Sequence, residues 1–325
     1  MNKLKNISNI IPYWAYNLIG FISGIIGIAS PIVGVFLWIT GRLNSEHNEH
    51  VVFIIISIIY ISTILVLFAK MRKYRAVMGN VICNTSEEMY SFLRESRNIL
   101  FDILKYKKRN QLSIHLLNQT IENYFEKSLD SLCNIIKSFT GQEVSACIKI
   151  IVPEEADEEI SLDDARVKTF VRSKNTDPNR KNSDEYYTNE EIPRIMDNSD
   201  FRDILDPKSP MKKSYFYKKS LIEHAKEEAK NDRSYDNTTK NWEKYYKSTI
   251  VVPIRIKHKR LYFSNKDKYF HVIGFLCVDS LSENAFLEKQ ERYNVDIVKA
   301  FAAEAYIILS KYQFYLKKME EDKIV

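Results

Sequence analysis

Two β-rich runs decide the fold of this chain: Tyr245–Lys257, "YYKSTIVVPIRIK", and Tyr269–Ser280, "YFHVIGFLCVDS". Each run is rich in β-branched and aromatic residues and is bounded by polar residues, which is typical of a buried strand. A basic segment joins them. The two runs therefore predict an antiparallel β-hairpin whose strands include Ser248–Ile256 and Val272–Val278.

The hairpin is followed by the segment "NAFLEKQERYNVDIVKAFAAEAYIIL" (Asn284–Leu309). A long amphipathic helix is predicted to begin in this segment and to run from about Tyr293 to Lys318. Its apolar residues recur at spacings of three and four, the period of a buried helical face. They are Val295, Val298, Ala302, Ala305, Leu309 and Tyr312. Two roles for this face remain open, because it could cover the sheet or form a seam with a helix of a second copy.

The hairpin and this helix together resemble the C-terminal half of a GAF domain. The matching features are Ser248, Pro253, Gly274, Asp279, Phe286 and the alanines Ala302, Ala303 and Ala305. The resemblance covers Gln111–Lys318 and rests on the last third of that range. It implies an α+β fold with a sheet of about six antiparallel strands and helices packed on one face. It also implies a sensor that binds a small molecule or dimerises, rather than an enzyme.

No sequence motif indicates catalysis, a metal or a cofactor. The chain lacks GxSxG, HExxH and P-loop patterns, and it lacks the NKxxF-type motif of cyclic-nucleotide-binding GAF domains, so the ligand stays unassigned. The cysteines lie too far apart for a zinc site or a dense disulfide framework and are read as reduced thiols: Cys83, Cys133, Cys147 and Cys277. The net charge of +6 is spread along the chain, which makes nucleic acid an unlikely partner.

Candidate ligand-binding residues come from the polar middle of the chain and from the end of the hairpin. In "MKKSYFYKK", Tyr215 and Tyr217 stand between two lysine pairs, a composition that suits stacking on a base and contacting phosphate. The alternative is an ordinary strand with solvated lysines. The full set of candidates is Tyr215, Tyr217, Trp242, Tyr246 and Asp279.

A further strand is predicted at "SACIKIIVP", Ser145–Pro153. One face of it carries Ala146, Ile148, Ile150 and Val152. The acidic run at residues 154–164 is expected to be an exposed loop. Its carboxylates could hold a hard cation, but the spacing and the glycine of an EF-hand are missing, so no metal site is predicted.

Helices are predicted upstream of that strand. Thr85 and Glu88 have the spacing of a capping box, which marks a helix start. The basic segment "KYKKRNQ" then separates a first amphipathic run from a second, which ends near Gly141, a suitable residue after a helix C-terminus. Residues 76–110 are therefore expected to be a helical stalk, or connector, and residues 111–325 a GAF-like sensor domain.

Residues 1–75 predict an N-terminal transmembrane helical hairpin with spans at about 18–40 and 51–69. Both spans are uncharged, and a helix rising about 1.5 Å per residue crosses a hydrocarbon core of about 30 Å in roughly 20 residues. A cleaved signal peptide fits less well, because the apolar stretch of a signal peptide is shorter than the first predicted span. Bases flank the hairpin on its outer sides, so the positive-inside rule predicts a multi-pass protein of a bacterial inner membrane with both termini cytoplasmic.

The first predicted span carries a stripe of glycines at helical spacing. Gly20, Gly24, Gly27 and Gly34 would lie on one side of a helix, where the missing side chains allow a second helix to approach closely. The stripe could pack inside the hairpin or between protomers. We therefore expect a lipid bilayer and a second copy of the chain among the partners.

The expected function is that of a membrane-anchored sensor without catalysis. The last predicted helix stops a few residues before Val325, so the output is expected to be the hairpin or a separate protein. One alternative resembles two-helix membrane-disrupting effectors of bacterial antiphage defence systems. The other is a scaffold for a separate signalling enzyme.

Overall fold

The structure is a computed structural model that describes residues 47–109, 114–152, 165–180, 192–205, 214–237, 239, 241–255 and 272–324. The chain divides into two units, Met1–Met78 and Gly79–Val325. The second unit contains the sheet and the candidate site.

A five-stranded antiparallel sheet forms the centre of the Gly79–Val325 unit. Its strands are β1 (Ser145–Val152), β2 (Arg166–Arg172), β3 (Phe216–Lys218), β4 (Ser248–Arg255) and β5 (Val272–Ser280). They lie in the order β2-β1-β5-β4-β3. The predicted hairpin and the predicted upstream strand are confirmed, and so is the α+β class. The described residues hold five strands, where the resemblance implied about six.

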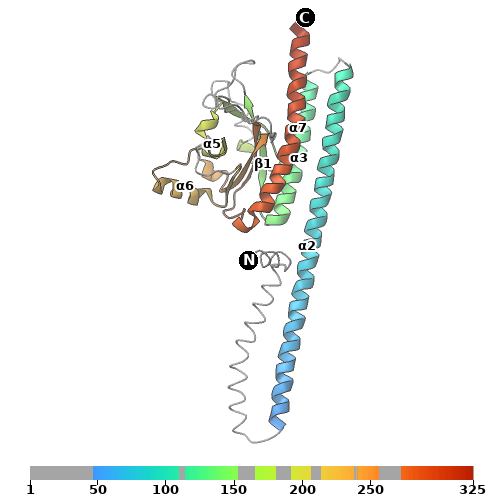
Figure 1. Ribbon diagram of the computed structural model, residues 1–325, viewed down its shortest axis with the longest axis vertical. Helices are drawn as coiled ribbons and strands as arrows, with labels where there is room; N and C mark the ends of the chain where they lie inside the picture. The colour runs from blue at the N-terminus through green and yellow to red at the C-terminus, as the bar shows by residue number, and fades with distance from the viewer. Residues whose placement is uncertain are drawn as a thin grey trace, which may run out of the picture. The chain divides into compact units, whose positions relative to one another are not determined.

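Three long helices cover one face of the sheet. They are α2 (His47–Arg109), α3 (Ile114–Thr140) and α7 (Glu291–Ile324), and α2 takes part from Gly79 onward (Figure 1). The rings of Phe92 and Phe301 stack with centroids 3.9 Å apart, and the hydroxyls of Ser96 and Tyr124 share a hydrogen bond of 2.6 Å. The predicted helix after the hairpin is thus confirmed as α7, and its apolar face covers the sheet.

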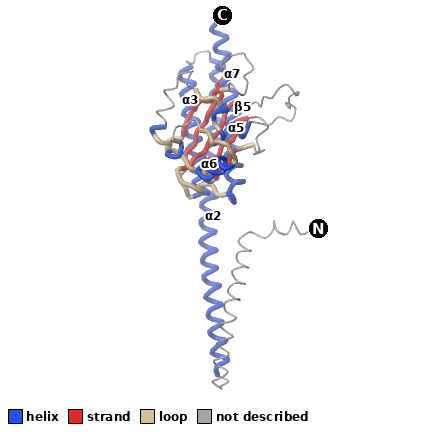
Figure 2. Tube along the Cα trace, turned by 90° about the vertical axis from the view of Figure 1, so that its left-hand side faces the viewer, coloured by secondary structure: helices blue, strands red, loops and turns tan. Residues whose placement is uncertain are grey.

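Shorter elements cover the opposite face of the sheet. They are η2 (Ile195–Asp197), α5 (Ser199–Leu205), α6 (Leu221–Lys230) and η3 (Trp242–Lys244). α5 and α6 overlie the strands in Figure 2. A second apolar core forms there around Phe201, Phe216 and Phe275. The sequence predicted helices on one face of the sheet, and this holds only for the long helices. Because both faces are covered, β4 is buried on both sides, which explains its almost unbroken apolar run.

The predicted helix start at Thr85 is wrong, because Thr85 lies inside α2. The capping-box pattern is local, and the residues before it are themselves helical, so the helix has no end there for Thr85 to cap. Two successive helices are present as predicted, but the first is longer than expected, since α2 continues through the predicted break to Arg109 and α3 begins at Ile114. The end of α3 is confirmed as well: Gly141 has φ +70° and donates its N–H to the Lys137 carbonyl at 2.7 Å.

The prediction of a transmembrane hairpin is corrected. Within the described ranges, no helix combines the length and the apolar composition that crossing a membrane requires. The predicted second span, Val51–Ala69, is not a separate element but part of the 63-residue helix α2, which continues through charged residues to Arg109. The predicted membrane location with both termini cytoplasmic depended on this hairpin and is therefore not supported either. The first predicted span, with Gly20, Gly24, Gly27 and Gly34, lies outside the described residues, as does the acidic run at 154–164.

Candidate functional site

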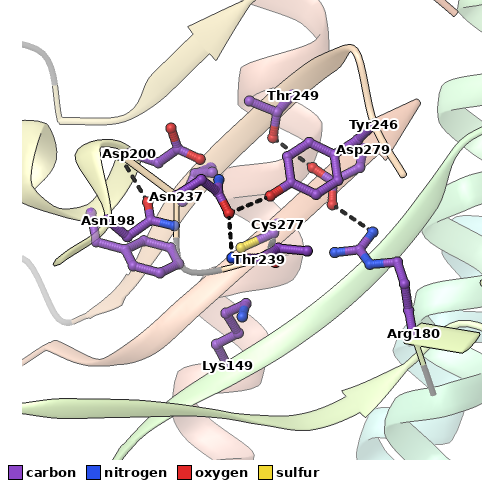
Figure 3. A pocket seen from close by; sticks show the side chains of 12 residues that line it. Lys149, Arg180, Asn198, Asp200, Asn237, Thr239, Tyr246, Thr249, Cys277 and Asp279 are labelled. Atoms are coloured by element: carbon purple, nitrogen blue, oxygen red, sulfur yellow. Dashed lines mark hydrogen bonds and ion pairs between the residues drawn. The ribbon is translucent and has the colours of Figure 1, made fainter. Parts of the chain in front are cut away.

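A polar pocket lies on the sheet face that the long helices leave uncovered (Figure 3). Its volume is about 320 Å³, counted with the solvent-open space at its mouth. The lining residues come from three strands, from α5 and from loop segments: Lys149, Arg180, Asn198, Asp200, Phe201, Asn237, Thr239, Tyr246, Thr249, Val251, Cys277 and Asp279.

Strand alternation places the side chains of the pocket floor. Successive residues of a strand point to opposite faces, so Thr249 and Val251 of β4 point to the same face. Asp279 of β5 is paired with Thr249, and Cys277 is paired with Val251. The intervening residues of both strands belong to the core under the long helices.

A buried ion pair forms one wall of the pocket. Arg180 Nη1 lies 3.4 Å from Asp279 Oδ2, and the two side chains are only 7% and 9% exposed. Asp279 Oδ1 accepts a hydrogen bond of 2.6 Å from the Thr249 hydroxyl. The Arg180 guanidinium also lies over the Tyr246 ring, 4.8 Å from its centroid. The pair ties the segment after β2 to the middle of the sheet.

A network of hydrogen bonds holds the loop on the other side of the pocket. The Tyr246 hydroxyl donates to Asn237 Oδ1 at 2.7 Å, and the Thr239 backbone N–H donates to the same oxygen at 2.9 Å. Burial, reinforced by Asp279 and Asp200, raises the pKa of Tyr246 above its ordinary range. Tyr246 therefore stays protonated and serves as a hydrogen-bond donor.

Asp200 is a buried carboxyl group at the start of α5. Its backbone N–H donates to Asn198 Oδ1 at 2.9 Å, and its Oδ1 accepts from the Tyr235 hydroxyl at 2.9 Å. Burial raises the pKa of Asp200 to about 7. Near neutral pH this carboxyl group can thus either donate or accept a proton in a hydrogen bond.

Asp200 should make the stability of the protein depend on pH. Because its pKa is higher in the folded than in the unfolded chain, the folded state binds more protons between about pH 4 and about pH 7. Stability contributed by protonated Asp200 is therefore present at the acid end of this window and is lost as the pH rises. Asp200→Asn, a neutral side chain of the same shape, should remove this loss. The measurement is urea unfolding of both proteins across the window.

The control for this comparison is Asp296→Asn, an exposed carboxylate on α7. Burial lowers the pKa of His224 to about 4, but His224 is present in every protein and cancels in the difference. A difference in stability between Asp200→Asn and the unsubstituted protein that stays constant across the window would contradict the assignment.

Lys149 supplies a positive charge without an acidic partner. Its ammonium group lies 5.9 Å from the centroid of the Phe201 ring, and within the described part of the chain it forms no ion pair. The charge of Arg180, by contrast, is balanced by Asp279. Lys149 is therefore the group in the pocket that is best suited to bind an anionic part of a ligand.

The structure brings together some of the residues predicted as ligand-binding and separates others. Tyr246 and Asp279 line the pocket. Trp242 lies beside it, 5.2 Å from Tyr235 and 6.1 Å from Tyr246 between ring centroids. Tyr215 and Tyr217 lie on the opposite face, against the core of the long helices, because strand alternation turns Phe216 toward the pocket side instead.

Sequence reasoning missed Lys149, Arg180, Asp200 and Asn237. Three of them stand in polar surroundings typical of solvated loops or helix ends, and Lys149 interrupts an apolar strand. That interruption was the one local signal, since a charged residue on the buried side of a strand needs a reason. In the described ranges no cluster of three metal-ligating side chains occurs.

Comparisons with known proteins assign no family to this chain. No family model matches it, and no curated protein does. A solved structure of a type II free methionine-R-sulfoxide reductase from Thermoplasma acidophilum aligns with a TM-score of 0.33 and 13% identity. The alignment covers 58% of this chain and 96% of the reductase. A likeness this weak carries no argument about function.

Proposed function

We propose that the Gly79–Val325 unit is a non-catalytic sensor domain that binds a small polar molecule bearing an anionic group. The observation that carries the proposal is the convergence of hydrogen-bonding side chains around Lys149 on a sheet face that the long helices leave open. The resemblance of the hairpin and α7 to a GAF domain also supports a sensor.

The charges of the pocket favour an anionic ligand. Arg180 and Asp279 neutralise each other, while Lys149 keeps its charge, and Asp200 is in part protonated near pH 7. An anionic group placed against Lys149 would gain a charge-assisted hydrogen bond. The amide of Asn198 and the carboxyl group of Asp200, on another side of the pocket, could then hydrogen-bond the rest of the molecule (Figure 3).

The hydroxyl and carboxyl groups of the pocket offer no strong catalytic arrangement. The nearest approach to a nucleophile with its base is the Thr249 hydroxyl, which donates to Asp279. That carboxylate already neutralises Arg180, so it is poorly suited to accept the hydroxyl proton. Binding without chemistry is the function that this geometry supports best.

Removing the charge of Lys149 should weaken ligand binding. The test is a thermal-stability screen of the full chain with free amino acids, dicarboxylates, nucleobases and nucleoside monophosphates, followed by titration of any stabilising compound. Lys149→Met should raise the Kd about tenfold to a hundredfold, the effect of losing a hydrogen bond to a charged group worth about 1.5–3 kcal/mol.

The matched control is Lys168→Met, which removes an exposed lysine from the neighbouring strand β2. It should bind as the unsubstituted protein does. Equal loss of binding in both variants would indicate a diffuse charge effect, and a screen in which no anionic compound stabilises the protein would count against the proposal.

A further inference from the structure

Two cysteines face each other across neighbouring strands under the pocket. Cys147 of β1 and Cys277 of β5 are directly paired in the antiparallel register. Both belong to the apolar core on the pocket side, so both side chains point to the same face. Directly opposed residues of antiparallel strands have Cα atoms about 4.5–5.5 Å apart, which lies within the range that a disulfide spans. The two sulfurs are free thiols in this structure.

Only one thiol of this pair lines the pocket. Cys277 is a lining residue, and its sulfur is drawn among the polar side chains in Figure 3. Cys147 lies one strand further and is 1% exposed. A small reagent that enters the pocket would therefore meet Cys277 first, with Cys147 behind it as a second thiol.

The surroundings of the pair favour a reactive thiol. Cys147 is paired on its other side with Arg172 of β2, and Lys149 follows two residues later on the same face. A hydrogen bond from Cys277, reinforced by Arg172 and Lys149, lowers the pKa of the Cys147 thiol. The same hydrogen bond, together with burial, raises the pKa of the Cys277 thiol well above its ordinary value, so the pair shares one thiolate, held by Cys147, and one proton, held by Cys277. Cys133, by contrast, lies in the core under the long helices, where burial raises its pKa to about 12. The chain thus contains a buried cysteine of the inert kind for comparison.

We propose that Cys147 and Cys277 form a redox-active dithiol, which a small hydroperoxide entering through the pocket converts into a cross-strand disulfide. This inference does not depend on the ligand proposed above.

The chemistry balances in two steps. With hydrogen peroxide, Cys277 first passes its proton to the Cys147 thiolate, and the Cys277 sulfur then attacks one peroxide oxygen; an S–O bond forms, the O–O bond breaks, and the leaving hydroxide takes up a proton to become water. The Cys147 sulfur then attacks the sulfenic acid at Cys277; the S–S bond forms and the S–O bond breaks, releasing a second water. The two sulfurs together lose two electrons to the peroxide, and a dithiol reductant reverses the change.

The test uses the full chain carrying Cys83→Ser, which removes the exposed cysteine. The reduced protein is treated with hydrogen peroxide under native conditions, alkylated after denaturation, and digested for mass spectrometry. The expected product is a Cys147–Cys277 linked peptide pair, which is lost on treatment with dithiothreitol. Cys277 should disappear at least about tenfold faster than Cys133, because Cys277 lines the pocket and has the Cys147 thiolate beside it, whereas Cys133 has neither.

A second variant makes the order of events visible. With Cys147→Ser added, Cys277 loses both the thiolate that takes its proton and the thiol that resolves the sulfenic acid, so it should react more slowly and stop at a sulfenic acid that dimedone traps. If this variant does not fold, the presence or absence of the Cys147–Cys277 linked peptide in the Cys83→Ser protein still tests the proposal. Full alkylation of both cysteines after peroxide, or oxidation of Cys133 at the same rate as Cys277, would overturn the proposal, since the latter would mean reaction through unfolding.

Discussion

Replacing Asp279 by alanine is expected to lower the free energy of unfolding by about 3–5 kcal/mol, the usual cost of leaving one charge of a buried ion pair without its partner. The Arg180 guanidinium, 7% exposed in the intact protein and lying over the Tyr246 ring, would lose the Asp279 carboxylate, and the Thr249 hydroxyl would lose its acceptor. Urea unfolding of Asp279→Ala measures the loss. Ligand binding should fall as well, because the same pair forms a wall of the pocket.

A second ion pair provides the control. Arg202 Nη1 and Asp236 Oδ2 are closer, at 3.2 Å, but their side chains are 33% and 43% exposed. Solvent screens such pairs, so Asp236→Ala should cost no more than about 1 kcal/mol from the ion pair. Equal losses in Asp236→Ala and Asp279→Ala would show that burial does not set the strength of the Arg180 pair.

The double variant Arg180→Leu/Asp279→Leu separates the contribution of the ion pair from the cost of removing only one of its two charges. Replacing both partners by apolar groups is often close to neutral. The double variant should therefore be more stable than Asp279→Ala. If it is less stable by the full sum of the two single losses, the two residues are not coupled.

Substitution of Gly274 is the other change with a large expected effect. A Cβ atom at this position would overlap the carbonyl oxygen of Lys149 on the neighbouring strand and would lie 3.2 Å from the Ile150 Cα. Backbone atoms cannot move aside as a flexible side chain can, so β1 and β5 would have to separate. Gly274→Ala should cost about 3 kcal/mol, at the upper end for overpacking in a core, and Gly274→Val at least as much. Thermal and urea unfolding measure both.

Gly79→Ala is the matched control for this prediction. Gly79 lies in α2, and a Cβ atom there would meet nothing within 4 Å. Because alanine favours a helix over glycine by about 1 kcal/mol, Gly79→Ala should leave the stability unchanged or raise it. A Gly274→Ala protein as stable as Gly79→Ala would contradict the close approach of the two strands.

The regular elements of this domain could be predicted from the sequence. Alternation in Ser145–Pro153, the apolar runs of the hairpin and the helical period after Glu291 each reflect burial repeated at the spacing of a strand or a helix. The end of α3 followed from Gly141, whose positive φ suits glycine. Each of these signals depends on residues that are close together in the sequence, so it can be recognised without knowledge of the fold.

Local patterns failed where a neighbouring segment changed their meaning. The capping-box residue Thr85 lies within α2, because the helix had already begun. The uncharged run Val51–Ala69 is likewise part of α2, and the predicted transmembrane hairpin is not supported. Tyr217 in β3, and Tyr215 just before it, pack against the core of the long helices, on the face opposite the pocket.

The sequence by itself determined strands β1, β4 and β5, helices α3 and α7, and their apolar faces, because each depends on residues close together in the chain. Only the tertiary structure decided the pocket. Arg180 and Asp279 are 99 positions apart, and the sheet order brings Cys147 against Cys277 across a separation of 130 positions, the difference of their numbers. Such contacts depend on strand order and register, which follow from the packing of the whole domain rather than from any short segment.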